Sequence, residues 1–224
     1  MLKTLAPILL LLVPAVASAQ PETNEGADTS AFDHAVAPVK NALEIGVATG
    51  YTQGAGKLGG GMNSVEDVAR AGGAVEVDVG ARIIPNLSVG AYGTFSQSAK
   101  GDQLASSTDV FGASAGVQAT WHFRPDTSVD PYVNLGGGWR GLWLSPSSGK
   151  TTSLQGLELA RLQVGVDYRI TPDIAVSPLI GAALDMFVSQ DSAMTTDYTE
   201  IQSKKVNFSG FAGIAGRFDL GGKR

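Results

Sequence analysis

Four residues have side chains that could together perform chemistry: Thr120, His122, Asp167 and Glu44. A hydroxyl, an imidazole and a carboxylate form the catalytic set of many hydrolases. Thr120 and His122 are two residues apart in an alternating segment, so they share one face of a strand. The same alternation places Asp167 and Glu44 at the same end of the sheet. A hydrogen-bonded, buried His122 is the simpler interpretation, because its face points into a narrow interior that no lipid substrate enters.

A glycine-rich stretch, Gly54-Ala55-Gly56-Lys57-Leu58-Gly59, matches the dinucleotide-binding pattern G-x-G-x-x-G, and Glu76 and Asp78 follow about twenty residues later. That function requires a long crossover helix packed on a parallel sheet. Ser64-Val65-Glu66-Asp67 is a capping box, but Gly72 limits its helix to one or two turns. We therefore predict an extracellular loop here and no bound cofactor.

The composition excludes several classes of site. The 224 residues include no Cys and only two His, and the formal net charge is −5. Disulfides and a lipid-anchored N-terminus are excluded, and two distant His residues without Cys give no support for a metal site. The acidic balance also disfavours a nucleic-acid partner.

The N-terminus has the pattern of an export signal. Lys3 precedes an apolar run at 8–13, and Ala17-Ser18-Ala19 supplies the small residues of a cleavage site. We predict a signal peptide at residues 1–19. Residues 20–41 are acidic, small and aperiodic, which predicts a flexible periplasmic tail.

Elsewhere the dominant pattern is strict alternation of apolar and polar residues. Residues 75–83 and 87–92 alternate on either side of Pro85-Asn86, as in a β-hairpin. The pattern recurs to give eight strands of about ten residues or more between residues 42 and 220, followed by a short tail at 221–224. Short turns alternate with long connections at about 52–72, 98–107, 145–155 and 188–204. These features predict an all-β fold: an eight-stranded antiparallel up-and-down transmembrane β-barrel.

The lysines decide which face points inward, because all lie in the termini, the loops or the strand ends, whereas a water-facing strand surface normally carries some. The polar face therefore lines the lumen, which side chains just fill in an eight-stranded barrel. Five acids and five arginines make it nearly neutral and should pair there. We predict two tiers of this charge network. The tier toward the outside is Glu76, Asp78, Arg140, Arg161 and Asp185, and the tier toward the periplasm is Glu44, Arg82, His122, Asp167, Arg169 and Arg217.

Aromatic residues gather near the strand ends of the apolar face, which predicts girdles at the two membrane interfaces. The predicted girdle residues are Tyr51, Phe95, Phe111, Trp121, Phe123, Trp139, Trp143, Tyr168 and Phe218.

Three segments carry a resemblance: 129–139 (VDPYVNLGGGW), 166–172 (VDYRITP) and 210–213 (GFAG). With them, residues 42–220 resemble the small outer-membrane β-barrels of the OmpA, OmpX and OmpW type. Chains of that group often end on an aromatic residue, whereas in this chain residues 219–224 follow Phe218. Pro178 also interrupts a strand, which predicts a bulge there.

The resemblance implies an outer-membrane location and roles that range from anchors to adhesins to small channels. We expect a non-catalytic, monomeric protein with a structural or surface-interaction role and with 53–72 and 189–204 as contact loops. A narrow channel for small or hydrophobic solutes is the alternative, and a lipid-modifying enzyme using His122 is the second. The expected partners are outer-membrane lipid and the barrel-assembly machinery, and the sequence names no extracellular partner.

Overall fold

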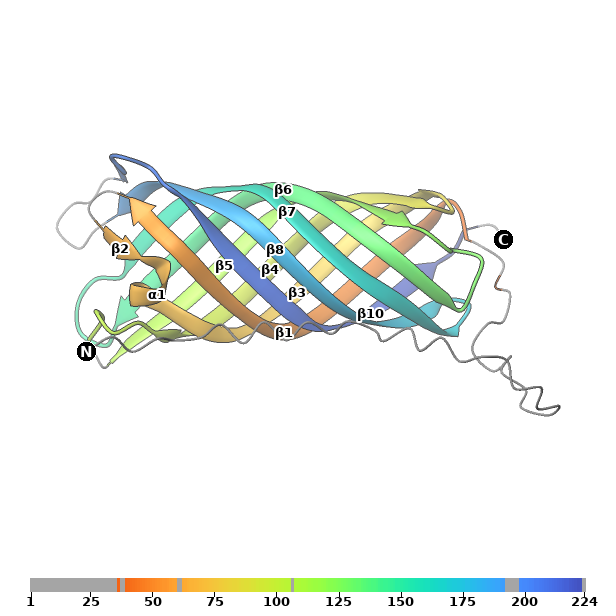
Figure 1. Cartoon of the computed structure of the whole chain (residues 1–224), viewed down its shortest axis with the longest axis horizontal. Helices are drawn as coiled ribbons and strands as arrows, with labels where there is room; N and C mark the ends of the chain where they lie inside the picture. Colours follow the sequence, from red (N-terminus) through yellow and green to blue (C-terminus); the bar gives the residue numbers. More distant parts are fainter. Residues whose placement is uncertain (1–35, 37–38, 60–61, 106, 192–197, 223–224) are drawn as a thin grey trace, which may run out of the picture. The chain divides into compact units, whose positions relative to one another are not determined.

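The computed structural model describes residues 36, 39–59, 62–105, 107–191 and 198–222, and in them eight long strands form a barrel (Figure 1). The long strands are β1 (Ala42–Gly59), β3 (Ala69–Ile84), β4 (Leu87–Lys100), β5 (Thr108–His122), β6 (Val129–Pro146), β7 (Thr152–Thr171), β8 (Ile174–Asp191) and β10 (Val206–Leu220). The short elements are β2 (Met62–Ser64), the one-turn helix α1 (Val65–Val68) and β9 (Thr199–Glu200).

The barrel closes by pairing its first long strand with its last. Each long strand is antiparallel to the next, and β1 pairs with β10 from Leu43↔Leu220 to Gly56↔Asn207. The two backbones approach closely at this seam, where a Cβ on Gly50 would lie 2.2 Å from the Ala212 carbonyl oxygen. Each of the eight long strands described therefore pairs with a neighbour on both sides, and the predicted all-β up-and-down barrel is confirmed.

The barrel has its apolar side chains outside and its polar side chains inside. Val117 and Ile170 on the outer wall are each 70% exposed, whereas Arg82, His122 and Asp167 inside are 0% exposed. In water this arrangement would expose the apolar wall to solvent. In a bilayer it is favourable, because lipid covers the apolar wall and the charged side chains pair inside the lumen. The prediction that the charged face points inward is therefore confirmed.

The strands continue beyond the apolar band, so the predicted loop boundaries were wrong. On β1 the outward apolar residues stop at Tyr51, yet the strand runs to Gly59 with Gln53 and Lys57 exposed. The backbone hydrogen bonds between strands continue beyond the region in contact with lipid. The alternation of apolar and polar residues marks only the part of each strand that contacts lipid, so it gives strands that are too short. Most of 53–72 is thus β1, β2, α1 and β3.

The capping box does start a single helical turn, since the Ser64 backbone N–H donates to Asp67 at 2.9 Å. In the described part of the chain, no helix has the length and apolarity needed to cross a bilayer.

A β-bulge in β7 breaks the alternation at a position the sequence did not reveal. Gly136↔Arg161 and Gly138↔Glu158 are the flanking pairs with β6, so β7 holds one extra residue there. Leu159 and Ala160 both face outward, which turns Glu158 into the lumen.

Pro178 does not produce the predicted bulge. The pairs Gly165↔Leu179 and Tyr168↔Val176 on either side of it keep one register between β7 and β8. Pro178 itself lies opposite Ile214 of β10 in an unbroken register. Pro178 has no N–H to donate, and the β7–β8 ladder accordingly skips the pairs between Leu179 and Val176 without inserting a residue.

The end of the barrel with the longer connections, the loop end, contains an apolar cluster that we call the apolar plug. It consists of Leu58, Val65, Ala69, Val110, Leu142, Leu154, Phe187 and Ile201. These side chains come from α1 and from the loop-side parts of β1, β3, β5, β6, β7 and β8 and from Ile201 after β9. The interior is therefore polar along most of its length and apolar at the loop end.

At the opposite end, the turn end, residues just before β1 contact the barrel. The Val36 N–H donates to the Asp126 carbonyl at 2.9 Å, the Asn41 N–H donates to the Arg82 carbonyl at 2.7 Å, and Val39 is buried. The predicted signal peptide at 1–19 lies outside the described residues, as does most of the predicted tail at 20–41.

Candidate functional site: the barrel lumen

The lumen holds a network of charged side chains in two groups. The group nearer the short turns, which we call the turn-end cluster, contains Glu44, Arg82, His122, Asp130, Asp167, Arg169, Arg217 and Asp219. The group nearer the plug, the mid-lumen cluster, contains Glu76, Asp78, Tyr92, Arg140, Glu158, Arg161 and Asp185.

Glu44 is the centre of the turn-end cluster. Arg82 on β3 donates to its Oε2 from Nε at 3.2 Å and from Nη2 at 2.6 Å. Arg217 on β10 donates to Oε1 at 3.0 Å, and Ser88 donates to the same oxygen at 3.2 Å. Neighbours on both sides of β1 thus neutralise one buried carboxylate, which compensates for its desolvation.

The hydrogen bonds of His122 define its tautomer. Its Nε2 lies 3.1 Å from Nη2 of Arg82, and a guanidinium can only donate, so Nε2 accepts. Nδ1 therefore carries the proton and donates to Asp130 Oδ2 at 2.8 Å. Both ring nitrogens are thus engaged within the cluster.

The sequence-predicted hydrolase set does not assemble. Thr120 accepts a hydrogen bond from the Asn134 amide at 3.1 Å. His122 is turned toward Arg82 and Asp130, while Asp167 binds the Ser177 hydroxyl and lies 3.6 Å from Nε of Arg217. No described hydroxyl is hydrogen-bonded to His122, so this geometry provides no activated nucleophile.

The turn-end cluster also contains Asp219, an acidic residue close to the C-terminus that was not predicted to face the lumen. Asp219 accepts from Arg169 at 3.0 Å and lies 3.7 Å from Nε of Arg82. Arg169 donates in addition to the Pro172 carbonyl at 3.1 Å. The residue after Phe218 is therefore a buried part of the lumen network.

In the mid-lumen cluster, Arg161 forms an ion pair with Glu76 and lies 4.3 Å above the Tyr92 ring. Tyr92 donates to Glu158 at 2.7 Å. Arg140 lies 3.8 Å from both Glu158 and Asp185, which face each other across β7 and β8. One guanidinium thus stands between two carboxylates.

Other polar residues complete this cluster. Gln163 donates to Glu76 at 3.2 Å, Gln118 donates to Asp78 at 2.6 Å, and Ser209 donates to Asp185 at 2.8 Å. The eleven charge-network residues chosen from the sequence all lie in these two clusters.

The predicted charge balance was wrong. The structure adds Asp130, Glu158 and Asp219 to the five predicted acids, so eight carboxylates face five arginines. Glu158 was not predicted to face the lumen because the bulge shifts the alternation of β7: odd-numbered residues face inward after the bulge, and even-numbered residues face inward before it. Asp130 and Asp219 lie at strand ends, where the alternation was too short to assign a face. The signal that could have identified Asp130 is its even spacing from Tyr132 and Asn134.

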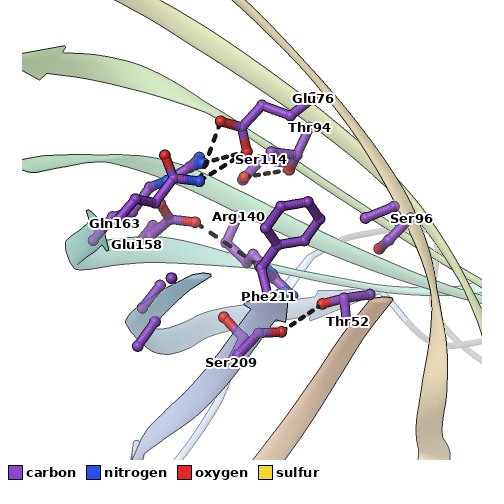
Figure 2. Close-up of a pocket in the computed structure, with 16 residues that line it drawn as sticks. Thr52, Glu76, Thr94, Ser96, Ser114, Arg140, Glu158, Gln163, Ser209 and Phe211 are labelled. Atoms are coloured by element: carbon purple, nitrogen blue, oxygen red, sulfur yellow. Dashed lines mark hydrogen bonds and ion pairs between the residues drawn. The ribbon is translucent and has the colours of Figure 1, made fainter. Parts of the chain in front are cut away.

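A small cavity lies within the mid-lumen cluster. Its volume is about 50 Å³, and Glu76, Arg140, Glu158 and Arg161 line it. That volume suffices for roughly three or four water molecules. Figure 2 shows the Phe211 ring projecting into it among the polar side chains. Phe211 is an inward aromatic residue that polarity patterning did not select.

The predicted girdle residues lie on the outer wall or are partly exposed there. Trp121, Phe123, Tyr168 and Phe218 are near the turn end, and the other five are nearer the loop end. Two pairs are in contact, with ring centroids 5.9 Å apart in both Phe95–Phe111 and Trp139–Trp143.

Comparison of the sequence with protein-family models and with curated proteins gives no match. Solved structures share the fold. Neisserial surface protein A aligns with a TM-score of 0.55 at 17% identity over 80% of this chain and 97% of that chain. The attachment invasion locus protein Ail of Yersinia pestis aligns at 0.44, with 15% identity over 80% and 99%. The N-terminal barrel of OprF from Pseudomonas aeruginosa aligns at 0.46, with 14% identity over 80% and 99%. The alignment with Neisserial surface protein A shows that the chain has the fold of a small outer-membrane β-barrel.

Proposed function

We propose that this protein is a non-catalytic outer-membrane barrel that serves as a sealed anchor and presents its loop end as an interaction surface. One observation carries the proposal: the lumen is filled by two charged clusters and covered at the loop end by the apolar plug. A barrel built to conduct would need a continuous polar path.

The plug opposes conduction by two physical effects. An ion crossing it would lose its hydration among Leu58, Leu154 and Phe187, which are at most 3% exposed, and such apolar constrictions block pores by excluding water. Below the plug, ions would also have to displace charged side chains that are already paired, such as Arg82 with Glu44. Each barrier alone resists flow, and they lie in series.

The loop-end rim is the surface that supports a contact role. Its strands extend past the apolar band and carry polar residues outward, among them Gln53 and Lys57. Exposed ion pairs also lie there, such as Arg70–Asp102 at 2.9 Å. Ordered strands make this rim a preformed surface, which lowers the entropic cost of binding.

The conductance of refolded protein in planar lipid bilayers tests the proposal. We expect no stable single-channel steps, while a known porin inserted in the same membranes supplies the positive control. Stable steps from the wild-type protein would contradict the proposal and favour the narrow transporter.

A transporter remains the second candidate because the mid-lumen cavity lies next to the plug. Arg140 lines this cavity together with Phe211, and Arg140 also lines a smaller one, of about 30 Å³, that reaches the plug residues Val65, Leu142 and Phe187. Movement of the plug would join these spaces. Replacing Phe187 by Ala is then expected to produce conductance in a transporter, whereas a sealed anchor stays silent because the turn-end cluster still blocks the lumen.

We assign no catalytic role to His122, since Arg82 and Asp130 engage both ring nitrogens. Mass spectrometry of lipid A from cells that overproduce the protein tests this assignment. We expect unmodified lipid. A mass change that His122→Ala abolishes would establish the lipid-modifying alternative.

A further inference from the structure

Three fully buried side chains from three strands meet at the turn end of the lumen. His122 is the last residue of β5, Asp130 is the second residue of β6 and Asp167 lies in β7, and all three are 0% exposed. One donor atom from each lies within 4.8 Å of the other two. The His122 Nδ1 atom is 2.8 Å from Asp130 Oδ2 and 3.8 Å from Asp167 Oδ2.

One of these atoms has no hydrogen-bond partner. Asp167 Oδ2 is buried and accepts no hydrogen bond, although a buried carboxylate oxygen without one is costly. The His122 Nδ1 atom lies 3.8 Å away and is hydrogen-bonded to Asp130 instead. A ligand that binds both carboxylates and the imidazole would satisfy this oxygen.

The remaining oxygens of the two carboxylates are held in place. The Arg124 backbone N–H donates to Asp130 Oδ1 at 2.9 Å, and the Ser177 hydroxyl donates to Asp167 Oδ1. Each aspartate is thus oriented through one oxygen and directs the other toward the imidazole. Metal ligands in proteins are commonly oriented by outer hydrogen bonds of this kind.

We propose that His122, Asp130 and Asp167 bind one divalent transition-metal ion of the Zn²⁺ class. Imidazole nitrogen and carboxylate oxygen are both Zn²⁺ ligands, with bonds of about 2.0–2.2 Å. Tetrahedral geometry with such bonds separates ligand atoms by about 3.3 Å. The separations of His122 Nδ1 from the two aspartate oxygens, 2.8 and 3.8 Å, lie on either side of that value, and all three donor atoms lie within 4.8 Å of one another, so a small contraction of the site would bring them to an ion.

The protons balance without a further reactant. Coordination through Nδ1 moves the His122 ring proton to Nε2, where Glu44 Oε2 lies 3.7 Å away as an acceptor. Arg82 and Arg217, which lie 3.1 and 3.5 Å from Nε2, then give up their contacts with the ring and keep their bonds to Glu44. The turn-end cluster has four carboxylates against three arginines, and this excess of acids favours an added cation.

The ion would connect β5, β6 and β7 next to the short turns. Because none of its ligands is exposed, the ion enters as the barrel folds. The amino-acid sequence does not indicate this site, because its three ligands lie on three different strands and the two closest in sequence are eight positions apart.

The test is to refold the full mature chain in detergent with Zn²⁺ or Co²⁺, remove free ion by gel filtration, and measure bound metal by elemental analysis. We expect about one ion per chain, and a Co²⁺ absorption spectrum of a tetrahedral site. His122→Ala should abolish retention. Ser177→Ala, which keeps all three ligands, should weaken binding by about 10–100-fold.

Two variants serve as matched controls. Asp185→Asn removes a lumen carboxylate from the mid-lumen cluster, and His34→Ala removes the only other histidine. Both should retain the ion, and a shift between boiled and unboiled gel samples shows that each variant is folded. Failure of the folded wild-type protein to retain metal overturns the proposal, as does retention that survives His122→Ala.

Discussion

Removing the guanidinium of Arg82 should destabilise the barrel strongly. Arg82→Met leaves Glu44 with only Arg217 as its cationic partner and Asp219 with only Arg169. Breaking a buried ion pair by removing one partner costs about 3–5 kcal/mol. The upper part of that range is expected, because the Arg82 side chain is fully buried and the lumen already has more carboxylates than arginines.

Urea unfolding of the protein in lipid vesicles, followed by tryptophan fluorescence, measures this loss. With a denaturant slope of about 2 kcal/mol per molar urea, a loss of about 4 kcal/mol lowers the midpoint by roughly 2 M. Arg70→Met is the matched control, because its ion pair with Asp102 is exposed and should contribute at most about 1 kcal/mol. If Arg82→Met does not fold, Arg82→Lys can be measured instead. It keeps the positive charge, and its urea midpoint should lie below that of Arg70→Met. A midpoint shift for Arg82→Met no larger than that of Arg70→Met would refute the reasoning.

Two other predictions follow from the plug and from the bulge. Leu154→Ala, in the plug, should lower the free energy of unfolding by about 2–5 kcal/mol by leaving a cavity. Leu157→Ala on the lipid-facing wall should cost clearly less in the same urea titration, because lipid fills the space; equal losses would contradict a packed plug. Deleting Ala160 should be tolerated, since it removes the extra residue of the bulge and leaves Glu158 facing inward. Deleting Val164 should abolish the gel shift of the folded barrel by turning the flanking side chains to the wrong faces, and a folded Val164 deletion would contradict the assigned register.

Much of the lumen could be predicted because a strand has a period of two. Once the absence of lysine from the strand faces indicated which side points inward, residues such as Glu76 and Arg161 could be assigned to the interior from parity alone. The odd or even position of a residue along its strand gives the face on which its side chain lies and its approximate level along the barrel axis. The ion pair between Glu76 and Arg161 then requires only that β3 and β7 face each other across a narrow lumen.

Parity fails where the pairing is irregular or where the apolar band ends. Glu158 was missed because a bulge two residues later reverses the alternation, and a bulge depends on the neighbouring strands rather than on its own residues. The plug was missed because Leu58 and Val65 looked like parts of a loop, whereas β1 extends past the lipid to Leu58 and the one-turn helix α1 buries Val65 in the plug.

The eight-stranded barrel and its inward charged face are both readable from the sequence, because they follow from local alternation and from the high cost of placing charges in lipid. Which charges meet depends on how the strands pair. His122, Asp130 and Asp167 converge because of strand register and closure, and the tautomer of His122 depends on Arg82 from another strand. These are relations between strands, and a pattern along one chain segment does not record them.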